Sequence, residues 1–238
     1  MKCPTRFTWQ FGRDLIQYLD PNADISMINK KWCWKDFNKN FSYLKNKVEK
    51  FFEEAKEGDS VLAAYSMVEY CNSDRKWAEK IIETSQIGDL AHAAYLMVKF
   101  CNSDKEWAEK IIEEAQIGNP AFAAYNMVDN CNSDKKWAEK VIESAQIGNP
   151  TYAAYLMIEY CGSDRKWAEK VIETSQIGDP AFAAYLMVEF YNSDQQWAEK
   201  IIETCQIGNP AHAAYKMVIF CNSNKEWADK IKNKGEDK

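Results

Sequence analysis

The stretch Trp137–Lys166 decides the fold, and it reads WAEKVIESAQIGNPTYAAYLMIEYCGSDRK. Its first half places Trp137, Val141 and Ile142 on one stripe of a 3.6-residue helix, whereas charged residues occupy the other side. Gly148 predicts the end of this helix, because glycine adopts the left-handed conformation without a Cβ penalty. The stretch therefore begins with an amphipathic helix that stops at a glycine turn.

The second half of the stretch predicts another helix, Thr151–Tyr160, which is apolar on nearly all sides. Asn149 can cap this helix, and Pro150 suits its first position, where a missing N–H costs nothing. Asparagine, or Gly162 in this copy, suits the left-handed C-cap. In other copies the S-x-x-E patterns at Ser103–Glu106 and Ser223–Glu226 predict capping boxes. Two helices and two tight turns leave no residues for strands.

The same pattern recurs every 30 residues, with tryptophan at the same place in each copy: Trp77, Trp107, Trp137, Trp167, Trp197 and Trp227. A fixed period between about 20 and 50 residues indicates a repeat array. We therefore predict an all-α, right-handed α/α solenoid of about six 30-residue helix-turn-helix repeats. The predicted array comprises residues 47–238 and includes a C-terminal capping helix.

Residues 1–46 do not repeat and are expected to form a helical N-terminal cap, basic and aromatic in character. One helix is predicted over Phe7–Leu19, and apolar residues spaced at three and four predict one long helix from Trp34 to Ala55. Residues 1–50 hold ten lysines or arginines against five acidic residues, whereas the rest of the chain holds 20 against 31. The chain thus has a basic head and an acidic body.

Composition limits the function classes. The chain has 238 residues, of which 46% are hydrophobic, so it has ample material for a core. There is no apolar run long enough to span a membrane and no signal-peptide pattern at the N-terminus. A net charge of −6 argues against a general nucleic-acid binder.

The cysteines share one column in five copies: Cys71, Cys101, Cys131, Cys161 and Cys221. Equivalent helices in stacked repeats lie about 8–10 Å apart, whereas a disulfide needs Cα atoms within about 7 Å. We therefore expect free thiols, which fit a reducing compartment and a cytoplasmic location. Without a C-x-x-C motif or a nearby histidine, no metal site is expected.

Catalysis has no positive support in the sequence. The nucleophile-elbow, P-loop and zinc-protease motifs are missing, and acidic residues that recur once per repeat are too far apart for a carboxylate pair. The tryptophans share a stripe with Ile, Ala and Val, so we expect them in the core. The chain is accordingly expected to be no enzyme and to use no cofactor.

Four positions on the second helix change between copies, whereas most others hardly change. They are represented by Tyr152, Leu156, Glu159 and Tyr160, a spacing that defines one helical face. Since packed positions cannot drift independently, we expect this face to be exposed, either as a neutrally drifting solvent face or as a binding surface. Its aromatic content favours a binding surface. The residues predicted to bind a partner protein are His92, Phe122, Asn126, Tyr152, Leu156, Phe182, Leu186, His212 and Lys216.

The repeat resembles known helical repeats. GNPAFAAYNMVDN (residues 118–130) followed by SDKKWAEKVIESAQIGNP (133–150) resembles a Sel1-like or tetratricopeptide unit, and the IGDP and IGNP turns resemble short HEAT-like repeats. The resemblance covers about Lys47–Lys230 and leaves the family open. These families are mostly protein-binding scaffolds, which is what the resemblance implies here.

The leading functional hypothesis is a non-catalytic scaffold for protein–protein interaction. One version is an adaptor or inhibitor that occupies a basic site on its target, which the acidic body suits. No membrane association is expected. The alternative is binding of nucleic acid or nucleotide through the basic aromatic head, at Trp9, Arg13, Lys30, Lys31, Trp32 and Trp34.

Overall fold

The fold is helical, which confirms the predicted all-α class. The structure is a computed structural model that describes residues 8–55 and 58–236, and these residues contain no strand. The chain divides into two compact units, Met1–Gly118 and Asn119–Lys238, here called the N-terminal and C-terminal units. Each is described by itself.

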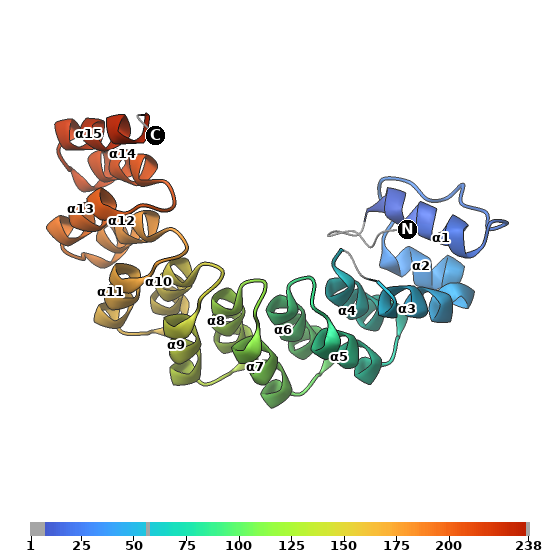
Figure 1. The fold of residues 1–238 in the computed structure, drawn as a ribbon. Helices are drawn as coiled ribbons and strands as arrows, with labels where there is room; N and C mark the ends of the chain where they lie inside the picture. The colour runs from blue at the N-terminus through green and yellow to red at the C-terminus, as the bar shows by residue number, and fades with distance from the viewer. Residues whose placement is uncertain (1–7, 56–57, 237–238) are drawn as a thin grey trace. The chain divides into compact units, whose positions relative to one another are not determined.

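The C-terminal unit consists of alternating first and second helices. The second helices are α8 (Pro120–Cys131), α10 (Pro150–Cys161), α12 (Pro180–Tyr191) and α14 (Pro210–Cys221). The first helices are α9 (Lys135–Ser144), α11 (Arg165–Thr174), α13 (Gln195–Thr204) and α15 (Lys225–Glu236). α10 packs against both α8 and α12, and α12 packs against α14, so the second helices stack side by side. Within this unit, Figure 1 shows the even-numbered helices in one layer and the odd-numbered helices in the other, which is the repeated packing of a solenoid.

Caps at both ends define each second helix as predicted. Asn149 Oδ1 accepts a hydrogen bond from the Tyr152 backbone N–H at 3.2 Å, and Pro150 occupies the first turn. At the other end the C-cap residue is left-handed, with φ of 52° at Asn192 and 64° at Gly162. A polar cap and a left-handed residue therefore bound each of these helices, as the sequence pattern indicates.

The first helices begin one residue later than predicted. Asp104, not Ser103, is the N-cap, and its Oδ1 accepts from the Trp107 N–H at 2.9 Å. The Ser103 N–H donates to the Met97 carbonyl at 3.1 Å in the turn that closes the previous helix. This turn leaves Ser103 buried, and the predicted S-x-x-E capping boxes are therefore wrong. At the second of them, Asn224 caps α15 instead of the serine before it.

The N-terminal unit combines the non-repeating head with the first repeats. Its helices are α1 (Trp9–Leu19), α2 (Trp34–Phe41), α3 (Lys45–Glu53), α4 (Ser60–Cys71), α5 (Arg75–Thr84), α6 (Leu90–Cys101) and α7 (Lys105–Glu114). α1 begins at Trp9, later than the predicted Phe7, because Thr8 has an extended backbone and is the N-cap; Phe7 itself lies outside the described residues. The predicted boundary between cap and array, after residue 46, stays a prediction.

The long helix predicted from Trp34 to Ala55 is broken. A 3-10 turn, Ser42–Leu44, separates α2 from α3. The Asn40 side chain donates to the Asp36 carbonyl at 2.9 Å and so competes with the helical backbone ladder just before the break. The break does not interrupt the core, because Phe41, Leu44 and Val48 are all buried.

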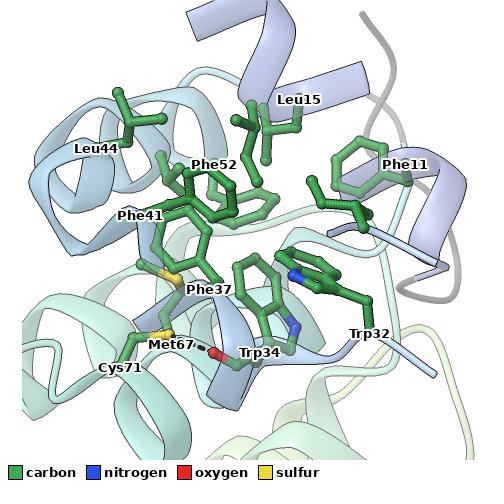
Figure 2. Packing of buried hydrophobic residues seen from close by; sticks show 13 residues of the cluster. Phe11, Leu15, Trp32, Trp34, Phe37, Phe41, Leu44, Phe52, Met67 and Cys71 are labelled. Atoms are coloured by element: carbon green, nitrogen blue, oxygen red, sulfur yellow. Dashed lines mark hydrogen bonds between the residues drawn. The ribbon is translucent and has the colours of Figure 1, made fainter. Parts of the chain in front are cut away.

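An aromatic core holds the head against the first repeat (Figure 2). Trp34 packs edge-on against Phe37 and Phe52, with ring centroids 5.6 and 6.0 Å apart. The Cys71 thiol of α4 donates to the Trp34 carbonyl at 3.5 Å. The head therefore covers the apolar end of the repeats in this unit that would otherwise face solvent, as a cap of a repeat array should.

Candidate protein interface

Large aromatic side chains are exposed on the second-helix layer of the C-terminal unit. Tyr160, Phe190 and Phe220 occupy equivalent positions on α10, α12 and α14 and are 59%, 57% and 52% exposed. Tyr152 on α10 is also exposed, and so is Ile219 on α14. We call these five residues the aromatic face. Exposed apolar patches mark interaction sites in soluble proteins, and five such side chains on one layer point to one here.

Contacts with a buried row of tyrosines hold this face in place. The Tyr155 ring stacks on Tyr152 at 5.9 Å and meets Tyr191 of the next repeat edge-on at 5.8 Å. The Tyr185 ring contacts Phe220 of the next repeat at 6.4 Å. Each buried ring thus braces aromatic residues on its own helix and on the following one. Side chains held in this way lose little entropy when a partner covers them.

The charge on α8, α10 and α12 of this layer is of one sign. Asp129, Glu159 and Glu189 are the only charged residues of α8, α10 and α12, and they occupy equivalent positions. Asp129 and Glu159 are exposed. Glu189 is half-buried, and its Oε2 has no hydrogen-bond partner in the structure. The layer therefore presents acidic groups beside aromatic rings.

The negative charge of these carboxylates contributes to raised pKa values of the neighbouring tyrosines. The pKa of Tyr160 is raised, chiefly by the charge of Glu159, because a phenolate beside a carboxylate is disfavoured. The pKa of Tyr155 is raised by burial first and then by Glu159. Burial, with a smaller contribution from Asp129, raises the pKa of Tyr125 in the same way. These phenols stay protonated at neutral pH and can donate hydrogen bonds.

The predicted partner-binding residues divide by exposure. Tyr152 and His212 are exposed, and the His212 ring stacks on Phe182 at 6.0 Å. Asn126 and Lys216 are half-buried, as are Phe182 and Phe122. Lys216 Nζ lies 5.1 Å from the centroid of the Phe220 ring, so α14 ends the acidic character of the layer.

Leu156 and Leu186 contradict the expected exposure of this face. They are only 8% and 9% exposed. α10 and α12 each have second helices on both sides, which leaves only a narrow exposed strip and covers the position that these leucines occupy. The residues that the predicted set omits are Tyr160, Phe190 and Phe220. Their column does vary between copies, so variation combined with large aromatic side chains could have identified them.

On α6 of the N-terminal unit the equivalent positions have different chemistry. His92 on α6 is half-buried, with its ring 5.9 Å from Tyr95. Lys99 takes the place of the acidic residue, and its Nζ donates to the Tyr95 hydroxyl at 2.9 Å and lies 5.3 Å from the Phe100 ring. On α4 of the same unit, however, Glu69 and Tyr70 repeat the acidic and aromatic pair, so the pattern is interrupted at α6 and is not confined to the C-terminal unit.

The alternative site in the basic head loses two of its aromatic residues. Trp32 and Trp34 are 8% and 4% exposed because they form part of the aromatic core, so neither can stack on a base. Trp9 is half-buried, with the Arg13 guanidinium 6.0 Å from its ring, and Lys30 and Lys31 are exposed. The exposed basic residues therefore have no exposed Trp32 or Trp34 ring beside them on which a base could stack.

The repeated tryptophans are half-buried, not enclosed in the core as expected. The indole N–H of Trp167 donates to Glu143 of the preceding repeat at 2.7 Å. The same bond joins Trp77 to Glu53 and Trp107 to Glu83, both at 2.8 Å, and Trp227 to Glu203 at 2.7 Å. The indole N–H therefore points to the surface and links neighbouring repeats.

Small hollows recur between neighbouring first helices. One of about 280 Å³ lies between α9 and α11 and is lined by Glu143, Gln146 and Lys170 among others. Another of about 290 Å³, between α5 and α7, is lined by equivalent residues, including Glu83 and Gln86. Their recurrence shows that the hollow is a product of the repeat geometry.

The thiols of the cysteine column are not bridged at Cys71, Cys101, Cys161 and Cys221. Burial raises the pKa of Cys71 to about 12 and that of Cys101 to about 11. In the part of the chain that the structure describes, no three His, Cys, Asp or Glu side chains are grouped so that they could hold a metal ion. Nor, among these residues, does any helix combine the length and the apolar character that crossing a membrane requires.

No model of a known protein family matches the chain, and neither a curated protein nor a solved structure matches it.

Proposed function

We propose that the protein is a non-catalytic scaffold that binds another protein through the aromatic face. The observation that carries this proposal is the exposure of Tyr160, Phe190 and Phe220 on three stacked helices, where the rings of Tyr160 and Phe220 contact tyrosines of the preceding repeat. Aromatic residues of this kind dominate the binding energy of protein interfaces. Two finer points belong to the same proposal: the repeats are of the Sel1-like, tetratricopeptide or short HEAT-like kind, and the protein acts in the cytoplasm.

The unbridged thiols support the cytoplasmic location, because unpaired cysteines persist in a reducing compartment. The exposed aromatic residues of the C-terminal unit all lie on its second helices, and this distribution favours a binding surface over a solvent face that drifts neutrally. Drift on a solvent face would replace large apolar side chains with polar ones, yet three of the four second helices of the C-terminal unit keep an exposed Tyr or Phe at this position.

A displayed library of random peptides tests the proposal without knowledge of the natural partner. The full chain serves as bait, and enriched peptides are tested against the double variant Tyr160→Ala/Phe190→Ala. The control is Lys140→Ala/Lys170→Ala, which changes two exposed residues in the first-helix layer of the same unit. We expect peptides that bind the wild type and the control but lose at least tenfold in affinity for the face variant. If every enriched peptide binds the face variant as tightly as the wild type, the aromatic face is not the interface.

A further inference from the structure

We propose that the occupant of the aromatic face is an extended, arginine-containing segment of the partner protein. This inference rests on the proposed function and names the chemistry of the partner. It starts from the composition of three stacked helices: α8, α10 and α12 together contain three acidic residues and no lysine or arginine. A partner that covers this layer must therefore bring positive charge or leave carboxylates unpaired against apolar surface.

The aromatic rings select arginine among the cations. Tyr160 and Phe190 lie next in sequence to Glu159 and Glu189, so two of the three carboxylates have an exposed ring beside them, whereas Asp129 is followed by Asn130. A guanidinium can stack its flat face on an aromatic ring while its N–H groups bond a carboxylate in pairs. An ammonium group offers no flat face and no fork of donors.

The repeat geometry sets the register of the segment. The acidic residues occupy equivalent positions on neighbouring second helices, and packed helices lie about 8–10 Å apart. A chain in the extended polyproline II conformation advances about 3.1 Å per residue and turns once every three residues, so every third side chain lies on the same side. An arginine at every third position therefore meets one acidic residue after another, beginning at Asp129 and ending at Glu189. Consecutive arginines do not fit this spacing, because three residues per turn direct neighbouring side chains to different sides of the chain.

The probe is a fluorescent synthetic peptide of serine and glycine with three arginines, one at every third position. Two further peptides carry glutamine in place of arginine, or the three arginines in a row. The face variant is Asp129→Asn/Glu159→Gln/Glu189→Gln in the full chain. Its matched control is Glu143→Gln/Glu173→Gln/Glu203→Gln, which removes the same charge from exposed residues of the first helices and keeps the oxygen that accepts from the tryptophan indoles. Circular dichroism of both variants verifies that they fold.

We expect the spaced-arginine peptide to bind the wild type and the control alike, and to bind the face variant about tenfold or more weakly. The glutamine peptide should not bind. Equal losses in both variants would show that the overall negative charge attracts the peptide, and tight binding of consecutive arginines would refute the register. If library peptides bind the aromatic face but the spaced-arginine peptide does not, the arginine inference fails and the proposed function stands.

Discussion

Replacing Gly178 by alanine should destabilise the C-terminal unit more than replacing Gly162 does. Both glycines have left-handed backbones, with φ of 85° and 64°. A Cβ at Gly178 would lie 2.5 Å from Asn149 Oδ1 and 3.1 Å from Thr151 Oγ1, whereas a Cβ at Gly162 meets no atom within 4 Å. The two substitutions therefore share the backbone cost and differ in crowding.

The expected magnitudes follow from these contacts. A left-handed alanine costs about 1 kcal/mol at either position. At Gly178 the new methyl group also displaces Asn149, which caps α10, and loss of such a cap costs about 1 kcal/mol more. We expect Gly178→Ala to lower the free energy of unfolding by about 2 kcal/mol and Gly162→Ala by about 1 kcal/mol.

Urea unfolding of the full chain, followed by helical circular dichroism, measures the difference. Gly162→Asn is the internal control, because Asn192 takes the same position in the next repeat with φ of 52°. This variant should keep the wild-type midpoint. If Gly178→Ala and Gly162→Ala lower the free energy of unfolding equally, then the close approach of Gly178 to the Asn149 cap is not the reason for glycine at this turn.

Three further predictions concern packing and protonation. Phe190→Ala should change the free energy of unfolding by less than about 0.5 kcal/mol, whereas Met157→Ala, at a fully buried site, should lower it by about 2–5 kcal/mol in the same urea assay. Iodoacetamide should alkylate the exposed Cys33 faster than the buried Cys71 in the native protein, as mass spectrometry of digested samples can measure; equal rates would contradict the burial. Thermal stability should fall above about pH 9, because the Cys71 thiol keeps its proton in the folded chain, where its pKa is about 12, and loses it on unfolding. The contribution of Cys71 to the free energy of unfolding is complete below the unfolded pKa and disappears as the pH rises toward 12. A melting temperature that is constant or rises between pH 9 and 11 would contradict it.

Local signals in the sequence predict the repeat correctly. The caps at Asn149 and Gly162 act within one turn of the chain, and the 30-residue period repeats them, so the helix pairs follow from short-range chemistry. Errors arise where two local signals compete. At Ser103 the closing turn of one helix overrides the capping box of the next, and at Asn40 a side-chain hydrogen bond accompanies the break that helical spacing alone does not reveal.

Exposure is harder to predict than helix position because it depends on neighbouring helices. The varying columns predict the correct helices, yet Leu156 is covered and Tyr160 is exposed on the same helix. The spacing of Trp34 within an amphipathic pattern predicts burial, whereas its place in an aromatic basic segment suggests a binding role. In the structure Trp34 is buried in the aromatic core. Variation among copies therefore indicates a face, and only the packing shows which of its residues reach solvent.

The account depends most on where a partner binds, and site-specific photo-crosslinking tests this directly. Benzoylphenylalanine is placed at Phe190 on the aromatic face or at Tyr18 on α1, two exposed positions, and each protein is irradiated with a peptide enriched from the library. We predict that the peptide cross-links from position 190 and not from position 18. Cross-linking from position 18 alone would contradict the account and place binding on the basic head.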